Sequence, residues 1–530
     1  VVRGIGDYGR GVGIPNIGGE VVFDRGYGRH PVVSAMCIGL VEHENLIRGE
    51  AQGVGNTLMA VGARTGRDGI DGAAFASEGS RREAEEASRP QVPVGDPLAG
   101  RLLLEASLEL VVSGHITGIQ DMGAAGLTAS ASEMASRAGT GVELDVARVP
   151  VREEGMTPRE ILLSESQERM LVVARKGREE AVRGILEKWE LEAADIGRVT
   201  DDGLFRVLED GEVVAEIPTL PLTEGCPTYE REGVEHPDVA ALRKRDVAAL
   251  AAGDDPAEAL LSLVGSPNLA SKRWVWEKCD ASVPTGSVRG PGGDAGFVRI
   301  RGTRKAVAAT VDGNGRYTYL HPRRGAMIAV AEAARNLVCV GAIPTAVTDN
   351  LNFGSPLDPS IYFQFREAVL GMAEACRLFE TPVTGGNVSF YNETDGDGRA
   401  IYPTPVVGMV GLVENVDTLT GHAFRAPGDA ILLLGENTAE IGGSELLYVL
   451  HGEVAGTPPA VDLVAERRLQ HAVLAMIQQA RIRSAHDCSA GGLACTLVES
   501  ALGDGESPLG IEVELGDDLP PFPLLFGEGQ

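Results

Sequence analysis

The sequence predicts an α/β protein made of two homologous halves. The main observation is an internal repeat, in which segments of the first half return in the same order roughly 365 residues later. A hydrophobic content of 43% and a total of 69 glycines are typical of a folded, loop-rich α/β chain. The repeated pairs are residues 15–23 with 382–390, 31–42 with 405–414, 119–127 with 485–493, and 164–167 with 527–530.

Short apolar runs and capping residues predict the elements of this fold. We expect a buried strand at residues 57–62, and a helix that begins at Pro97 and ends before Gly114. A second helix is expected at residues 126–138, directly after a glycine-rich turn. Further expected elements are strands at 20–23, 32–40, 296–302 and 305–310, and a helix at 325–339.

Charge and cysteine content narrow the class of partner. A net charge of −29 argues against duplex nucleic acid or an anionic membrane as the main partner. It leaves room for a phosphate ligand, because Mg²⁺ and backbone N–H groups neutralise phosphate locally. No apolar run reaches transmembrane length, and seven cysteines without a Cys-x-x-Cys pair are typical of reduced thiols. We therefore expect a cytoplasmic protein.

Asp121 and its repeat counterpart Asp487 each precede a glycine-rich turn that leads into a helix. One interpretation is a carboxylate that caps free N–H groups at the helix start. The other is a Mg²⁺ ligand beside a phosphate held at the helix N-terminus. Occurrence in both copies favours the second interpretation for at least one of the two residues.

Residues 164–167 contain Glu165, Ser166 and Gln167, which suit a ligand with polar groups. On an extended segment, the side chains of Glu165 and Gln167 project to one face and that of Ser166 to the other. The alternative interpretation is the polar edge of a strand. In the second copy, Gly529 replaces Ser166, and this loss of a hydroxyl favours a working site in the first copy.

Polar residues of the second half form another candidate group. Asn387 and Ser389 follow Gly385 and Gly386, which allow close approach of a ligand to the backbone. Asp349 could accept a hydrogen bond from an adenine amino group or a ribose hydroxyl. A tight turn would explain the glycines, and an Asx-turn would explain Asp349.

Taken together, these motifs resemble those of the synthetase subunit of phosphoribosylformylglycinamidine synthase. The resemblance covers nearly the whole chain, and the combination of motifs is highly specific. It rests on residues 4–9, 13–15, 18–20, 95–97, 120–127, 164–167, 266–272, 291–295, 351–354 and 385–389.

The resemblance implies an aminoimidazole-ribonucleotide-synthetase-like fold, duplicated into alternating A and B type domains with pseudo-twofold symmetry. The expected boundaries are 1–50 for a partial first A-type domain and 51–220 for the first B-type domain. A linker is expected at 221–290, the second A-type domain at 291–425, and a partial second B-type domain at 426–530. On this interpretation the sequence is truncated at both ends.

The resemblance also implies a carbon–nitrogen ligase of purine biosynthesis. ATP would activate formylglycinamide ribonucleotide as an iminophosphate, and ammonia would displace the phosphate to give formylglycinamidine ribonucleotide. Mg²⁺ and ATP are the implied cofactors. The implied roles are Mg²⁺ binding for Asp121 and Asn387, ATP binding for Asp349 and Gly386, and substrate binding for Glu165, Ser166, Gln167 and Ser389.

Other parts of the family's machinery are expected outside these 530 residues. The catalytic histidines implied by the resemblance would precede Val1, so no catalytic residue is assigned within the chain, and the isolated segment is expected to be inactive. Ammonia would come from a separate glutamine amidotransferase subunit, joined by a small bridging subunit.

Two other functions fit part of the sequence. One is another ATP-dependent enzyme of the same superfamily, but those enzymes are single copies, and the covalent duplication weighs against them. The other is a non-catalytic nucleotide-binding scaffold that holds a structural ADP in the degenerate copy. Binding of formylglycinamide ribonucleotide would distinguish the ligase from the scaffold.

Overall fold

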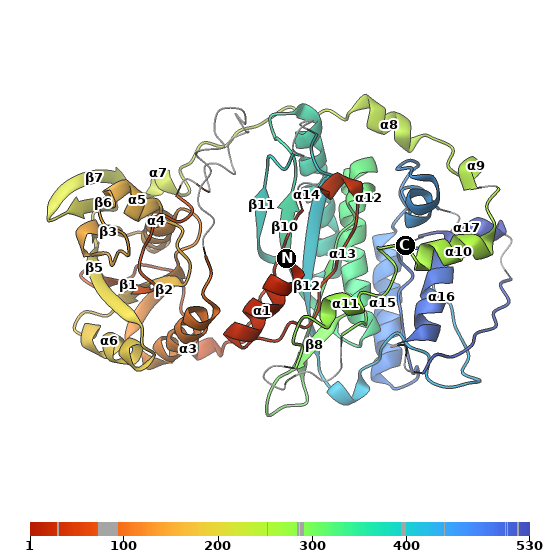
Figure 1. Ribbon diagram of the computed structural model, residues 1–530, viewed down its shortest axis with the longest axis horizontal. Coiled ribbons are helices and arrows are strands. Elements are labelled where there is room, and N and C mark those ends of the chain that lie inside the picture. Colours follow the sequence, from red (N-terminus) through yellow and green to blue (C-terminus); the bar gives the residue numbers. More distant parts are fainter. Residues whose placement is uncertain are drawn as a thin grey trace. The chain divides into compact units, whose positions relative to one another are not determined.

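The computed structural model describes most of the chain as two compact units (Figure 1). The seven-strand unit comprises residues 11–13 and 37–230, and the five-strand unit comprises residues 1–10, 14–36 and 231–530. No helix among the described residues is long and apolar enough to cross a membrane. The described residues are 1–28, 31–70, 72, 94–251, 253–282, 286, 291–393, 399–438, 440–503, 505, 507–516 and 519–529.

The seven-strand unit is built on a mixed sheet with the strand order β2-β4-β1-β5-β3-β6-β7. Neighbouring strands pair antiparallel, except β3 and β6, which are parallel. The strands are β1 (Thr57–Gly62), β2 (Ile116–Asp121), β3 (Gly141–Asp145), β4 (Arg169–Ala174), β5 (Glu192–Thr200), β6 (Leu204–Glu209) and β7 (Glu212–Pro218).

Helices pack on both faces of this sheet, so its central strands are apolar on both sides. Leu58 of β1 packs in one core with α4 and α5, whereas Met59 packs in the other core with α3 and α6. This division follows from the alternation of side chains along a strand. The helices are α3 (Pro97–Ser113), α4 (Gly126–Ala138), α5 (Pro158–Leu163), α6 (Glu179–Lys188) and α7 (Thr219–Leu222), with 3₁₀ turns η2 (His43–Asn45) and η3 (Val146–Arg148).

The five-strand unit contains a sheet with the order β11-β10-β12-β9-β8. β10 and β11 are parallel, and the other neighbours are antiparallel. β11 is an edge strand, and most of its residues are exposed. The strands are β8 (Gly296–Arg299), β9 (Ala306–Asp312), β10 (Ile343–Asn352), β11 (Val383–Ser389) and β12 (Thr404–Val413).

Helices α13 (Pro322–Cys339) and α14 (Pro359–Phe379) pack together against this sheet (Figure 1). Small residues of α13, such as Ala329 and Ala333, are fully or almost fully buried and allow this close packing. The other helical segments are α1 (Val2–Val12), α8 (Pro237–Arg243), α9 (Ala248–Ala251), α10 (Pro256–Val264), α11 (Arg273–Trp276), α12 (Gly315–Leu320), α15 (Leu463–Gln478), α16 (Gly492–Leu502), α17 (Pro521–Phe526), the 3₁₀ turns η1 (Arg25–Tyr27) and η4 (Val416–Thr418), and the π-helix η5 (Leu447–His451).

Several predicted elements are confirmed, and their ends have local causes. Asp96 caps α3 by accepting from the N–H groups of its first turn, and Gly114 ends that helix in a left-handed conformation. The strand predicted at 57–62 is β1, and the helix predicted at 126–138 is α4. The helix expected at 325–339 begins three residues earlier, because Pro322 is accepted at the first helical position.

Two expected strands are not formed. Residues 20–23 and 32–40 have no regular secondary structure, and neither do residues 430–434, the repeat counterpart of β1. Val33, Leu40 and Leu432 are exposed. A strand needs neighbouring strands to satisfy its backbone groups, and an apolar pattern alone does not supply them.

The duplication is visible in how each copy packs the start of one helix. Gly126 begins α4 with a φ of 51°, and a Cβ atom there would overlap the carbonyl oxygen of Ser164. Gly492 begins α16 with a φ of 66°, and its Cβ would lie 2.6 Å from the carbonyl oxygen of Gly527. Both positions require glycine for backbone conformation and for space. The helix start therefore contacts the same repeated motif in both halves.

Substitution of Gly126 by alanine should destabilise the seven-strand unit strongly. Gly139, at the other end of α4, has a similar φ of 65° but open space around its Cβ position, so Gly139→Ala is a matched control. We expect Gly139→Ala to lower the free energy of unfolding by about 1 kcal/mol, through backbone strain alone. Gly126→Ala should lower it by roughly 3 kcal/mol or more, because overlap is added to strain. Urea denaturation followed by circular dichroism measures both, and equal losses would contradict the close approach.

Candidate functional site

Asp121 lies at the end of β2, beside the start of β4. It pairs with Met170 in the sheet, and the next N–H, that of Met122, donates to the carbonyl oxygen of Arg169 at 3.2 Å. The Asp121 side chain is exposed and does not cap α4, whose N-cap residue is Ala125. An exposed carboxylate beside a helix N-terminus is a suitable oxygen ligand for Mg²⁺.

Glu165 occupies the same edge of the sheet, in the segment between α5 and β4. Its carboxylate accepts a hydrogen bond of 3.0 Å from the backbone N–H of Ala125, at the start of α4. A Cβ on Gly69 or on Gly72 would lie 2.9 Å from the second carboxylate oxygen of Glu165. The two glycines and the helix start therefore fix the position of this carboxylate.

The two residues that follow Glu165 face in different directions. Ser166 is 1% exposed, and its hydroxyl contacts the Asp68 carboxylate and accepts from the N–H of Gly66 at 3.0 Å. Gln167 is exposed, and its amide donates to the carbonyl oxygen of Glu165 at 3.1 Å. The motif thus presents Glu165 and Gln167, while the Ser166 side chain points into the protein, as alternation along an extended segment predicts.

The second copy reproduces one of these contacts in the five-strand unit. Glu528 accepts from the backbone N–H of Gly491 at 2.7 Å, as Glu165 accepts from Ala125. Glu528 is 2% exposed and also accepts from the Tyr317 hydroxyl and from the N–H of Glu445. Burial raises the pKa of Glu528. Its carboxylate is thus enclosed by protein donors, whereas Glu165 is only partly buried.

Asp487, the counterpart of Asp121, belongs to a buried group that the sequence did not reveal. His486 Nδ1 lies 2.5 Å from a carboxylate oxygen of Asp294, and His486 Nε2 lies 3.1 Å from Glu499. Burial alone would lower the pKa of His486, but Asp294 and the other carboxylates raise it well above the ordinary value. Ligand atoms of Asp294, His486 and Asp487 lie within 4.8 Å of one another. The adjacency of His486 and Asp487 in the sequence was the one signal that could have indicated this group.

Asp349 and Gly386 are neighbours on the parallel strands β10 and β11. A Cβ on Gly386 would overlap the Asp349 carboxylate, so glycine is required at this register. Burial raises the pKa of Asp349. The strand pairing therefore places a carboxylate and an accessible backbone side by side.

Asn387 and Ser389 lie further along the exposed edge strand β11. The Asn387 side-chain oxygen accepts from the Asn350 amide at 2.5 Å, across the same strand pair. The Ser389 hydroxyl accepts from the Asn392 amide at 3.1 Å. The four predicted residues Asp349, Gly386, Asn387 and Ser389 thus share one strand pair of the five-strand unit.

Two family models match this chain, and each matches it twice. The description "AIR synthase related protein, N-terminal domain" applies to residues 1–41 and 292–413. The description "AIR synthase related protein, C-terminal domain" applies to residues 53–209 and 426–526. These matches confirm the predicted fold class and the internal duplication.

Curated relatives cover the whole chain. The chain is 56% identical over 530 residues to "Phosphoribosylformylglycinamidine synthase subunit PurL" of Moorella thermoacetica, covering 100% of this chain and 72% of the relative. It is 51% identical over 531 residues to the protein of the same name from Caldanaerobacter subterraneus, again covering 100% and 72%.

Solved structures from Thermotoga maritima that match this chain are also named as PurL proteins. The structure named "Structure of PurLQS from Thermotoga maritima" matches with a TM-score of 0.71 and 27% identity, covering 99% of this chain and 76% of that one. "T. maritima PurL complexed with FGAR" matches with a TM-score of 0.70 and 28% identity, covering 97% and 75%. "T. maritima PurL complexed with ATP" matches with a TM-score of 0.69 and 27% identity, covering 99% and 76%. The chain therefore belongs to the PurL subunit family of phosphoribosylformylglycinamidine synthase, the ligase of purine biosynthesis that its motifs resemble.

Proposed function

We propose that this chain takes part in the ATP-dependent amidation of formylglycinamide ribonucleotide to formylglycinamidine ribonucleotide. The observation that carries the proposal is 56% identity over the whole chain to a PurL subunit. Structures of a related protein named as complexes with ATP and with FGAR give the two substrates the proposal requires.

The reaction is a phosphoryl transfer followed by a displacement. The amide oxygen of the substrate attacks the γ-phosphorus of ATP, which forms an iminophosphate and releases ADP. Ammonia then attacks the activated carbon, phosphate leaves with the oxygen, and the amidine remains after loss of a proton. The protein contributes positioning and charge stabilisation, which dominate catalysis of phosphoryl transfer.

In the seven-strand unit, we assign Glu165 and Gln167 to substrate binding and Asp121 to Mg²⁺. Glu165 is held in place by the start of α4, and its partly exposed carboxylate can accept from substrate hydroxyl or amide groups. Ser166 contributes by fixing this segment, because its hydroxyl is buried. Mg²⁺, when bound, supplies positive charge that stabilises the transferring phosphoryl group.

In the five-strand unit, we assign Asp349 and Gly386 to ATP, Asn387 to a second Mg²⁺ and Ser389 to substrate. The open backbone at Gly386 suits close approach of a nucleotide, and Asp349 supplies an acceptor beside it. The exposed amide oxygen of Asn387 is a hard ligand of the kind that Mg²⁺ takes.

We further propose that ammonia reaches this chain from a separate glutamine amidotransferase subunit, with a small bridging subunit. The name "PurLQS" of a matched structure indicates a multi-subunit complex for that relative. All seven cysteines are free, which fits a reducing compartment, and we place the reaction in the cytoplasm. The non-catalytic scaffold is less well supported, because the matched relatives are named as synthase subunits.

The full-length protein, given ATP, Mg²⁺ and an ammonium salt, should form ADP only when formylglycinamide ribonucleotide is present. One ADP should appear for each amidine formed, because one phosphoryl group leaves per amidation. A coupled ADP assay and mass spectrometry of the ribonucleotide measure the two products. The proposal would be refuted if the rate of ATP hydrolysis were the same with and without formylglycinamide ribonucleotide. Tight binding of ADP without binding of the ribonucleotide would also refute it.

Asp121→Asn should raise the Mg²⁺ concentration needed for half-maximal activity by about tenfold or more, because a carboxylate ligand loses its charge. Asp96→Asn is the matched control. Asp96 is an aspartate of the same unit that caps α3, and asparagine caps helices almost equally well. The control should leave the Mg²⁺ dependence unchanged. Equal Mg²⁺ requirements in wild type and Asp121→Asn would remove Asp121 from the metal site.

A further inference from the structure

We propose that Asp68 and Arg169 are positioning residues that hold Glu165 and Gln167 in place for the substrate. This inference rests on the function proposed above. It adds Asp68 and Arg169 to the site that the sequence motifs indicate. Arg152 and Arg67 support them, since Arg152 contacts Asp68 and Arg67 holds the loop that carries it.

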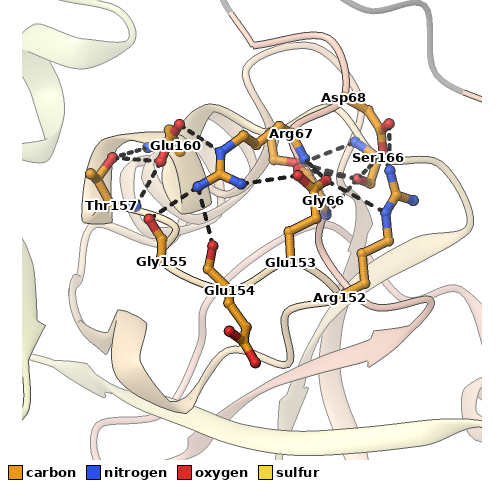
Figure 2. Close-up of polar contacts among 11 residues, drawn as sticks. Gly66, Arg67, Asp68, Arg152, Glu153, Glu154, Gly155, Thr157, Glu160 and Ser166 are labelled. Carbon is orange, nitrogen blue, oxygen red and sulfur yellow. Dashed lines mark hydrogen bonds and ion pairs between the residues drawn. The ribbon is translucent and has the colours of Figure 1, made fainter.

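The Asp68 carboxylate lies between Ser166 and Arg152 and contacts both side chains (Figure 2). The Asp68 side chain is 4% exposed and contacts both the Ser166 hydroxyl and the guanidinium of Arg152. The carbonyl oxygen of Asp68 accepts from the N–H of Glu165 at 2.8 Å. Asp68 thus holds the motif at two successive residues, once through its side chain and once through its backbone.

Arg169 holds the same motif from the other side. Its guanidinium donates to the carbonyl oxygen of Ser164 at 2.6 Å and to that of Ser166 at 2.7 Å. A third hydrogen bond of 2.9 Å reaches the Thr65 hydroxyl, in the loop that carries Asp68. Burial lowers the pKa of Arg169 to about 10, so the guanidinium keeps its charge at neutral pH. The carbonyl groups on both sides of Glu165 are therefore fixed by one side chain.

Arg67 ties this loop to the helix that leads into the motif. It donates to Glu160 at 2.8 Å and to Glu153 at 3.0 Å, as Figure 2 shows. Glu160 also belongs to a capping box with Thr157 at the start of α5, and Ser164 is the C-cap residue of that helix. The loop, the helix and the motif are consequently joined into one polar network.

The second copy makes the same backbone approach without the serine hydroxyl that Asp68 contacts. The N–H of Glu528 donates to the carbonyl oxygen of Glu440 at 3.0 Å, as Glu165 does to Asp68. Gly527 and Gly529 stand in place of the two serines, and Gly529 packs against the Thr438 side chain. The Glu440 carboxylate accepts from the N–H of Ala460 at 2.8 Å. The same backbone approach is therefore made without a buried serine–aspartate contact.

Stability is a poor explanation for the network in the first copy. Burying a carboxylate or a guanidinium carries a desolvation penalty that its ion pairs roughly offset, so such groups add little net stability. They do fix geometry, because a fully satisfied polar network has one arrangement. A carboxylate and an amide that must meet a substrate need such fixed geometry, since small displacements lower the rate of reaction strongly.

The test compares Michaelis constants for the two substrates in the full-length protein with ammonium chloride as the nitrogen source. Asp68→Asn should raise KM for formylglycinamide ribonucleotide about tenfold or more and leave KM for ATP within about twofold. Arg152→Met, at a side chain that is 46% exposed, should give a smaller change of the same kind, and Arg152→Lys should restore part of it. Asp145→Asn, at another buried aspartate of the same unit, is the control and should leave both constants unchanged.

Each outcome decides between a positioning role and a purely structural one. Equal changes in both Michaelis constants, or no change in either for both Asp68→Asn and Arg152→Met, would overturn the inference. If Asp68→Asn does not fold, the Arg152 pair decides alone, because that residue is half exposed. Failure of the wild type to form ADP in response to the ribonucleotide would instead refute the proposed function.

Discussion

The site depends on the close packing of a helix start against the backbone of the motif that both copies share, residues 164–167 in the first copy and 527–530 in the second. Gly126 makes this contact in the first copy and Gly492 makes it in the second, both in a left-handed conformation. The contact brings the N–H of Ala125, the N-cap residue of α4, within hydrogen-bonding distance of the Glu165 carboxylate. Because the helix also follows directly after β2, the same packing sets Asp121 and Glu165 at one edge of the sheet.

The two copies share this backbone geometry and differ in what surrounds it. In the first copy, buried Asp68 and Arg169 hold a motif whose Glu165 and Gln167 remain accessible. In the second copy, Glu528 is enclosed by Tyr317 and by backbone donors, and its pKa is raised by burial. A carboxylate whose hydrogen bonds are made within the protein fixes the local geometry, whereas a partly exposed one can exchange partners with a ligand.

The sequence predicted the duplication, the fold class and the strongly patterned elements, because repeats and capping residues are local signals. Pro97 and Gly114 marked both ends of α3, and the candidate site residues were found from the internal repeat and from the family resemblance. The sequence did not predict which segments pair as strands or which distant side chains contact one another. Residues 32–40 have the apolar pattern of a strand but form no regular secondary structure. Nothing in the sequence around Asp68 or Arg169 indicates that these residues contact partners about a hundred residues away. The group formed by Asp294 and His486 was missed for the same reason.

We propose that the first copy's motif meets the substrate and that its counterpart in the second copy does not. The most direct test compares Glu165→Gln with Glu528→Gln in the ammonia-dependent synthesis of formylglycinamidine ribonucleotide. Glu165→Gln should lower kcat/KM for the ribonucleotide by about 100-fold, whereas Glu528→Gln should stay within about threefold of wild type. Comparable losses in the two variants, or full activity of Glu165→Gln, would contradict the account.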